Sequence, residues 1–246
     1  MDLPGRTALV TGASSGIGRA TAIAMARRGV RVKATGRDVS ALEALAKDCG
    51  AAIHPADLGV AEEVDRIARW AGPVDLLVNN AGFGWAGPFA NLGPARMHEL
   101  LQVNLAAPIR LAALLVPGMI ERGVGHVVNV ASIAGHVGVR SEAVYSATKA
   151  GLIAFTESLR YELAGSGVGA TVVSPGAVRT AFFDREGRHY DRAFPRPVAP
   201  ERVARSIIRA VEGNRAQVFV PRWMAFPAWF RGAWPSLYRR LAGRYG

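Results

Sequence analysis

The stretch Thr7-Ala8-Leu9-Val10-Thr11-Gly12-Ala13-Ser14-Ser15-Gly16-Ile17-Gly18 joins a short apolar run to a glycine-rich turn. Residues 7–11 predict a buried strand, and residues 16–28 have the period of a helix. Glycine between a strand and a helix lets backbone amides approach a ligand, and the positive helix N-terminus favours a phosphate. The stretch therefore predicts a pyrophosphate site, although any tight turn between a strand and a helix has a similar composition.

Apolar runs of strand length alternate with longer stretches of helical period along the rest of the chain. Strands are expected at residues 30–36, 51–54, 74–79, 124–130, 169–174 and 217–221, and helices at 39–48, 60–70, 94–122, 143–163 and 200–212. The strands are too continuously apolar to face water on one side, which is typical of a parallel sheet covered by helices on both faces. We therefore expect an α/β, doubly wound fold with ligands at the carboxyl ends of the strands.

The chain shows no linker, repeat or low-complexity tract, so residues 1–221 are expected to form a single domain. Residues 177–200 mix charges, aromatics and prolines, which is typical of a long mobile loop that serves a site. Residues 222–246 form a tail in which arginines alternate with aromatic residues. This composition fits a subunit contact, our first expectation, and then a peripheral membrane contact or a cover over the substrate cleft.

Composition and charge exclude several classes of protein. Half of the 246 residues are apolar, which excludes a disordered chain. The single cysteine and a start without a signal-peptide pattern favour the reducing cytoplasm. Glycine, proline and arginine interrupt every apolar stretch before the roughly 20 residues that a membrane span needs. The net charge of +11 fits nucleic acid, an anionic lipid surface, an anionic cofactor or only a soluble surface, but no nucleic-acid-binding fold matches.

The end of the second expected strand reads Ala34-Thr35-Gly36-Arg37. A site specific for NAD would carry an acid there to bind the ribose 2′-hydroxyl, and this acid is missing. The planar guanidinium of Arg37 suits a 2′-phosphate instead. We therefore predict that NADP(H) is preferred and that NAD(H) is a weaker alternative. Asp38 works slightly against this interpretation, and the alternative is a solvated arginine at a strand end.

Three further motifs complete a pattern: Asn79-Asn80-Ala81-Gly82 after the fourth strand, Ser132 after the fifth, and Tyr145-Ser146-Ala147-Thr148-Lys149 beyond it. In this order, and together with the glycine-rich turn, they resemble the short-chain dehydrogenase/reductase family over residues 5–221. The resemblance implies a Rossmann-type, seven-stranded parallel sheet and hydride transfer between a nicotinamide and a carbonyl or hydroxyl carbon. It also implies a homodimer or homotetramer.

The resemblance assigns cofactor contacts to particular residues. The adenosine, 2′-phosphate and pyrophosphate would lie against Gly12, Ser14, Ser15, Gly16, Ile17, Gly18, Arg37, Asp57 and Leu58. The rest of the cofactor, with the nicotinamide, would lie against Asn80, Ala81, Gly82, Tyr145, Lys149, Pro175, Gly176, Val178 and Thr180. Members that prefer NADP often carry a basic residue where this chain has Ser15, so Arg37 would carry most of the preference.

Reduction of a ketone needs a proton for the developing alkoxide, and Tyr145 is the candidate donor. A free tyrosine has a pKa of about 10, so a nearby positive charge must favour its phenolate. Lys149 lies four residues later, on the same face of a helix. Ser132 can bind the same substrate oxygen, and the resemblance makes Asn104 a proton relay. Each residue alone also fits an ordinary structural role.

Bulky apolar residues near these motifs are candidates for substrate contact: Phe83, Trp85, Ile133, Phe182 and Phe183. They favour a hydrophobic carbonyl or alcohol, or they only pack a lid. The five histidines show no metal-ligand spacing, so no catalytic metal is expected. The alternative to an enzyme is an NADP-binding protein with vestigial catalysis that contacts a partner or a membrane through its tail.

Overall fold

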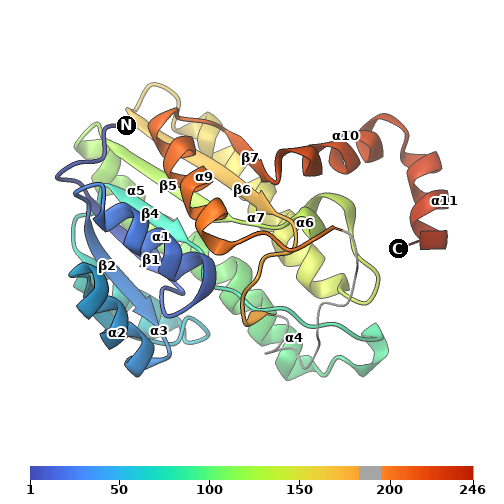
Figure 1. Cartoon of the computed structure of the whole chain (residues 1–246), viewed down its shortest axis with the longest axis horizontal. Coiled ribbons are helices and arrows are strands. Elements are labelled where there is room, and N and C mark those ends of the chain that lie inside the picture. Colours follow the sequence, from blue (N-terminus) through green and yellow to red (C-terminus); the bar gives the residue numbers. More distant parts are fainter. Residues whose placement is uncertain (183–194, 246) are drawn as a thin grey trace.

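The computed structural model describes residues 1–182 and 195–245. Seven parallel strands form one sheet in the order β3-β2-β1-β4-β5-β6-β7 (Figure 1). The strands are β1 Thr7–Thr11, β2 Arg31–Gly36, β3 Ala52–Pro55, β4 Leu76–Asn79, β5 Gly125–Val130, β6 Val168–Pro175 and β7 Gln217–Val220. The expected doubly wound, Rossmann-type sheet in a single domain is confirmed.

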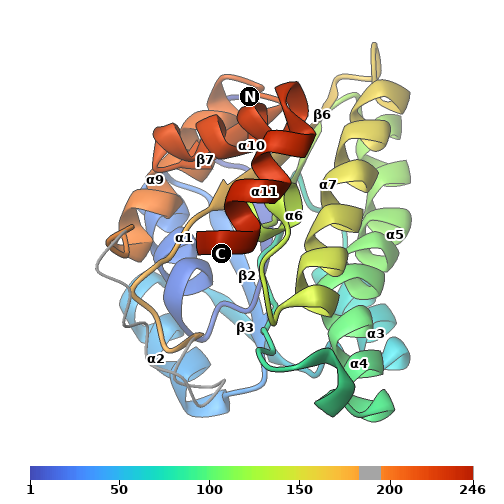
Figure 2. The same cartoon turned by 90° about the vertical axis from the view of Figure 1, so that its right-hand side faces the viewer.

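Helices cover both faces of the sheet (Figure 2). One face carries α1 (Gly16–Ala26), α2 (Val39–Cys49) and α9 (Pro200–Glu212). The other carries α3 (Ala61–Ala71), α5 (Ala107–Glu121) and α7 (Ala143–Glu162). The short helix α6 (Ile133–Val137) and the helix α4 (Pro94–Leu101) both pack against α7.

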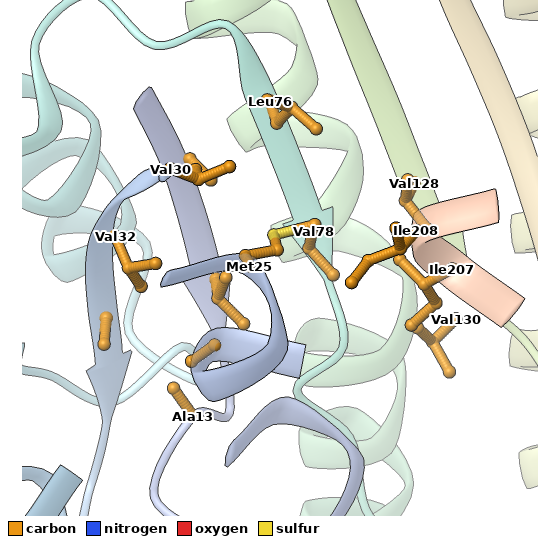
Figure 3. Close-up of a cluster of buried hydrophobic side chains, with 14 of the residues drawn as sticks. Ala13, Met25, Val30, Val32, Leu76, Val78, Val128, Val130, Ile207 and Ile208 are labelled. Atoms are coloured by element: carbon orange, nitrogen blue, oxygen red, sulfur yellow. The ribbon is translucent and has the colours of Figure 1, made fainter. Parts of the chain in front are cut away.

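Neighbouring residues of one strand belong to opposite sides of the core. Ala8 and Val10 of β1 lie in the cluster under α1, α2 and α9, whereas Leu9 lies in the cluster under α3 and α5. Figure 3 shows the first cluster, where Met25 of α1 lies beside Val78 of β4 and the α9 isoleucines lie beside β5. Side chains alternate between the two faces of a strand, so a sheet buried on both sides needs apolar residues at consecutive positions.

The order of the strands places a crevice next to β1. The chain runs outward from β1 through β2 to β3 and then crosses back to place β4 on the other side of β1. The connections after β1 and β4 therefore diverge at the carboxyl edge of the sheet. Ligands of open α/β sheets bind at this kind of topological switch point.

Three segments differ in detail from the sequence-based expectation. The helix expected at residues 94–122 is divided by a π-helical turn, η2 (Gln102–Ala106), between α4 and α5. The tail is helical and forms η3 (Arg222–Met224), α10 (Ala225–Ala233) and α11 (Pro235–Tyr245). In the expected loop 177–200, Val178 and Val198 form a parallel bridge, and residues 183–194 lie outside the described residues.

The continuous helical stretch Pro94–Glu121 meets the length and hydropathy of a membrane span, with a mean hydropathy of 1.7 in its most apolar window. The expectation that glycine, proline and arginine exclude every candidate membrane span therefore does not hold when candidates are judged by length and composition alone. In the fold, α5 packs against α3, β4 and β5, and 44% of that window is buried. The apolar composition thus serves at least in part to cover the sheet, as in any core helix.

Buried His126 of β5 makes the stability of the fold depend on pH. Burial lowers the pKa of His126 to about 4 from 6.5, and its Nε2 lies 2.8 Å from the Thr171 hydroxyl. Between these two values the unfolded chain binds more protons than the folded chain, so stability falls as the pH falls through that range. We expect His126 to account for about 2 kcal/mol of the loss in unfolding free energy between pH 7 and pH 5.

Urea unfolding of the wild-type protein and of His126→Gln at several pH values checks this expectation. The Gln variant keeps a polar side chain next to Thr171 but has no group that titrates in this range. Its unfolding free energy should therefore depend less on pH below 7 than that of the wild type. Parallel pH profiles of the two proteins would show that His126 does not cause the loss.

Candidate active site

Two adjoining cavities lie at the carboxyl edge of the sheet. The larger, of about 610 Å³, runs from the glycine-rich turn past the ends of β2 and β4. The smaller, of about 360 Å³, lies between the end of β5, α7 and the segment after β6. Ile17, Thr180 and Phe182 line both cavities, so a long ligand in the first can reach the second.

Thr11 joins the ends of β1 and β4, which form the floor of the larger cavity. The backbone N–H groups of Asn80 and Ala81 each donate to Thr11 Oγ1 at 3.0 Å. The Asn80 side chain donates in return to the Thr11 carbonyl at 2.9 Å. These bonds hold the Asn80-Ala81-Gly82 segment against the glycine-rich turn.

Two glycines of the turn stand where no side chain fits. A Cβ on Gly12, which has a φ of 63°, would lie 2.8 Å from Ala81 Cα. A Cβ on Gly18 would lie 2.3 Å from the Gly12 carbonyl oxygen and 2.5 Å from Asn80 Nδ2. Gly12 thus lets the floor come close to the turn, and Gly18 lets α1 pack directly onto it.

The N-terminus of α1 opens into the larger cavity and fits a pyrophosphate. Ser15 and Gly16 line the cavity at this point, the Ser15 side chain does not cap the helix, and the first turn has no acidic residue. A helix N-terminus presents N–H groups and partial positive charge to an anion. The geometry therefore fits the pyrophosphate of a dinucleotide, which the chain would hold largely with its backbone.

Arg37 lies at the far end of the same cavity, beside Asp57. The Arg37 guanidinium is 4.0 Å from the Asp57 carboxylate, and both side chains are well exposed. Asp38 also lines the cavity, but its carboxylate caps α2 by accepting from Ala41 N at 3.0 Å. Ser14 lies directly across from Gly36. This end of the cavity thus combines a cation with a hydroxyl, as a 2′-phosphate would require.

Most of the expected cofactor positions line these cavities. The larger cavity is lined by Gly12, Ser14, Ser15, Gly16, Ile17, Arg37, Asp57, Leu58, Asn80, Ala81, Gly82 and Thr180. The smaller is lined by Tyr145, Lys149, Pro175, Gly176 and Val178, with Thr180 again. Gly18 lines neither, because it is covered by Gly12 and Asn80.

Tyr145 and Lys149 line the smaller cavity from one face of α7. The Lys149 ammonium lies 5.8 Å from the centre of the Tyr145 ring and donates to the Val130 carbonyl at 2.9 Å. Lys149 is almost completely buried, and this burial lowers its pKa to about 8. The pair thus brings an ammonium and a phenol together on the wall of one cavity.

Ser132 lines the same cavity as Tyr145, at the start of α6. Its Oγ accepts a hydrogen bond from Ala134 N at 3.1 Å, which caps the helix. The hydroxyl hydrogen of a serine that accepts in this way can still be donated to a ligand. Ser132 therefore combines the structural role of a cap with the ability to bind a substrate oxygen.

Asn104 lies fully buried in the π-helical turn η2. Its Oδ1 accepts from Phe83 N at 3.0 Å, and its Nδ2 donates to the Phe83 carbonyl at 2.8 Å. A Cβ on Gly82 would lie 2.8 Å from Asn104 Oδ1 and 3.4 Å from Lys149 Nζ. Asn104 thus fixes the loop after β4 close to the lysine.

The expected substrate contacts divide into three groups. Ile133 and Phe182 line the smaller cavity, and the Phe182 ring lies 5.8 Å from that of Tyr145. Phe83 lines only the larger cavity, and Trp85 lines neither because it packs over Gly87. Phe183 lies outside the described residues.

The site also contains residues that were not predicted from the sequence as site residues, among them Thr11, Arg96 and Met224. Thr11 was identified only as a strand end, and its place directly before the first glycine is the signal that could have shown its role. Arg96 of α4 lies over the Phe83 ring at 4.2 Å and lines the larger cavity. Met224 of η3 is buried and lines the smaller cavity. No sequence pattern connects Arg96 with the site, whereas Met224 belongs to the tail, for which a cover over the substrate cleft was one of the expectations.

Within residues 1–182 and 195–245, no group of three or more His, Cys, Asp or Glu side chains is arranged to hold a metal ion. Tyr145 and Lys149 instead bring a phenol and an ammonium to the wall of the smaller cavity. These two groups lie next to the larger cavity, because the two cavities adjoin at Ile17, Thr180 and Phe182.

The model of the short chain dehydrogenase family matches residues 6–191. The chain belongs to this family. As a short-chain dehydrogenase, it is an oxidoreductase that acts on CH–OH or C=O groups with NAD(P). The glycine-rich turn, the Tyr145–Lys149 pair and all residues that line the larger cavity lie within the matched region, whereas Pro195 and Met224 of the smaller cavity lie outside it.

Relatives of this short-chain dehydrogenase span nearly its whole length. The ketoacyl reductase HetN of a Nostoc species is 37% identical over 227 residues, which are 89% of this chain and 79% of HetN. The structure of a short-chain dehydrogenase from Sphingobium yanoikuyae in complex with NADPH matches with a TM-score of 0.83 and 28% identity, over 94% of this chain and 95% of that one. A further short chain dehydrogenase/reductase family protein matches with a TM-score of 0.83 and 35% identity, over 89% and 97% of the two chains.

Proposed function

We propose that this short-chain dehydrogenase transfers hydride between NADP(H) and a carbonyl or secondary alcohol of a hydrophobic substrate in the cytoplasm. The observation that carries the proposal is the placement of Tyr145, Lys149 and Ser132 around one cavity that adjoins the dinucleotide groove. The NADPH complex of the Sphingobium relative and the name of the ketoacyl reductase relative support it.

The positive groups of the larger cavity would fix the direction in which the dinucleotide binds. The glycine-rich turn and the α1 N-terminus would bind the pyrophosphate, and Arg37 would bind the 2′-phosphate with help from Ser14. When bound, the nicotinamide supplies or accepts the hydride. Asn80, Ala81 and Gly82 would line the path toward Lys149.

The smaller cavity would supply the proton and hold the reacting carbon. Tyr145 would donate its phenolic proton to the substrate oxygen during reduction and take a proton back during oxidation. The positive charge of Lys149 would stabilise the phenolate, and the Ser132 hydroxyl would hold the substrate oxygen. Asn104 would serve as the relay residue between the lysine and solvent, a role that its burial next to Gly82 supports.

The walls of the smaller cavity favour an apolar substrate. Their side chains include Ile133, Ala134, Val137, Val139, Phe182 and Met224. A wall of this kind gains free energy from alkyl or aromatic groups and offers little to a polyhydroxylated sugar. We therefore propose a long-chain, alicyclic or aromatic carbonyl compound, with acyl chains supported by the name of HetN.

Arg37→Ala is expected to weaken NADPH binding by about tenfold to a hundredfold and to leave NADH binding unchanged. Its guanidinium would make a charge-assisted hydrogen bond to a phosphate that only NADPH carries, which is worth about 1.5–3 kcal/mol. Fluorescence titration of both cofactors measures the effect. Arg209→Ala is the matched control, because Arg209 is an exposed arginine on α9 that lines neither cavity. An equal loss for NADPH and NADH would refute the role of Arg37.

Turnover of ketones and ketoacyl thioesters of increasing chain length tests the remainder of the proposal. We expect NADPH-dependent reduction whose kcat/KM rises with the apolar surface of the substrate. Small sugars and hydroxy acids of similar size serve as the comparison set. A preference for the polar set would refute the hydrophobic substrate class while leaving the cofactor assignment intact.

A further inference from the structure

The C-terminal helices α10 and α11 extend from one end of the molecule beside α6, as both cartoon views show (Figures 1 and 2). Residues 222–246 contain five arginines and seven aromatic residues but no aspartate or glutamate. The rest of the chain therefore holds all 19 acidic residues. The tail thus combines unbalanced positive charge with a high density of aromatic side chains.

Helix α10 turns its apolar side away from the domain. Its Arg231 side chain donates to the His136 carbonyl of α6, which attaches the helix to the domain on that side. Phe226, Trp229 and Phe230 have the i, i+3, i+4 spacing of one helical face. Phe226 and Trp229 are 62% and 59% exposed. A helix that only packed on the domain would be oriented the other way, with its apolar face inward.

Helix α11 continues the same apolar surface. Trp234, which directly precedes it, lies 5.5 Å from the Trp229 ring and 5.8 Å from the Phe230 ring. Leu237 and Leu241 follow at helical spacing and are exposed, as is Trp234. We call the six side chains Phe226, Trp229, Phe230, Trp234, Leu237 and Leu241 the tail face.

Two arginines of α11 lie away from the tail face. On a helix with 3.6 residues per turn, Arg239 and Arg240 lie well away from the line through Trp234, Leu237 and Leu241. The helix thus has an apolar face and a basic face without any acidic residue. This is the pattern of a helix that lies in the plane of a lipid interface, with tryptophan at the level of the headgroups.

We propose that the tail face docks this protein onto the surface of a bilayer that contains anionic phospholipid. The tail face would enter the interface, and the tail arginines and the net charge of +11 would attract the lipid phosphates. A second copy of the chain is a poorer occupant. A symmetric contact through the tail face would place the ten arginines of two tails in one region of the dimer, and neither tail holds an acidic residue that could neutralise them.

The docking surface and the smaller cavity share a structural element. Met224, in the turn directly before α10, is buried and forms part of the cavity wall. Docking would therefore bring the cavity close to the source of a lipophilic substrate, and this consequence alone rests on the proposed function. Binding to vesicles itself does not depend on catalysis.

Flotation with vesicles of phosphatidylcholine, with and without about one third phosphatidylglycerol, tests the proposal on the full chain. We expect the wild-type protein to float with the anionic vesicles, to float at least about tenfold less with the neutral ones, and to be released by salt. Trp229→Ser/Trp234→Ser should lower binding to the anionic vesicles by about tenfold or more. Arg239→Gln/Arg240→Gln should lower it by about tenfold or more on anionic vesicles only.

Two controls separate docking from misfolding and from general surface adhesion. Tyr161→Ser removes an aromatic side chain that is 78% exposed on α7, far from the tail in sequence, and should leave flotation unchanged. NADPH affinity and circular dichroism of the tail variants should equal those of the wild type, which shows that they fold. Equal flotation with anionic and neutral vesicles, or equal flotation of the wild type and the tryptophan variant, would overturn the proposal. The proposal would also be overturned if the wild-type protein bound no vesicles and the tryptophan variant lost a dimer or tetramer in light scattering. A second copy of the chain would then be the occupant of the tail face.

Discussion

Tyr145→Phe is expected to lower kcat by about 10³-fold while NADPH binds as tightly as before. The change removes one oxygen atom and keeps a buried ring that packs against Phe182. Because the phenolic oxygen would be the group that exchanges a proton with the substrate, its loss leaves the hydride step without a nearby acid or base. Steady-state turnover and a fluorescence titration with NADPH measure the two parts of this expectation.

The matched control for this change is Tyr161→Phe, on the same helix. Tyr161 is exposed to solvent at the far end of α7, so its hydroxyl group should have no effect on turnover. Equal rates for Tyr145→Phe and the wild type would contradict the role of Tyr145. They would instead favour a protein that binds the dinucleotide for another purpose.

Lys149→Met is expected to lower kcat by about 10²-fold to 10⁴-fold. The substitution removes the charge that would stabilise the phenolate of Tyr145, 5.8 Å from the ring centre, and keeps most of the side-chain volume. It also removes a cation beside Gly82, so NADPH should bind more weakly as well. Turnover at saturating NADPH separates the two effects.

The same variant should show how much stability the buried ammonium costs. The pKa of Lys149 is lowered from 10.5 to about 8, so between these values the unfolded chain binds more protons than the folded chain. Stability of the wild-type protein should therefore rise with pH across this range, by at most about 3 kcal/mol from this one group. Lys149→Met should lose this rise, which urea unfolding at pH 8 to pH 10 detects.

At neutral pH the melting temperature of Lys149→Met should stay close to that of the wild type. The free energy of unfolding gained by removing the buried charge is offset by the loss of the hydrogen bond to the Val130 carbonyl. A fall of many degrees would show that Lys149 is mainly a structural residue, and an unchanged kcat would show that it does not act on Tyr145. The two measurements thus distinguish the catalytic role from a packing role.

The order of strands and helices could be predicted from the sequence because it depends on short-range periodicity. Consecutive apolar residues such as those at 8–10 are needed wherever a strand is covered on both faces, and this requirement is visible in the sequence itself. The Tyr145–Lys149 pair is equally local, since a separation of four residues on a helix places both side chains on one face. The glycine-rich turn could be predicted for a similar reason. It must directly follow the first strand for its backbone to approach a phosphate, so the signal lies in adjacent residues.

The long helix at residues 94–122 shows where such local reasoning fails. Its apolar period is continuous, and nothing in the sequence marks the π-helical turn at Gln102–Ala106. The turn is defined by its neighbours, because it carries the Asn104 side chain to the backbone of Phe83, 21 residues away. Contacts over such separations depend on which elements pack together.

The doubly wound sheet, the glycine-rich turn and the Tyr145–Lys149 pair could therefore be predicted from the chain alone, since each follows from periods and spacings within a few residues. Other features became visible only in the folded chain: Thr11 connects β1 to β4, Trp85 lies outside both cavities, and Met224 lines the smaller one. The folded chain also shows that the apolar side of α10 is turned away from the domain. Crossover connections and helix packing bring together residues that are far apart in the chain. Local periodicity does not specify such long-range contacts, so they could not be predicted from it.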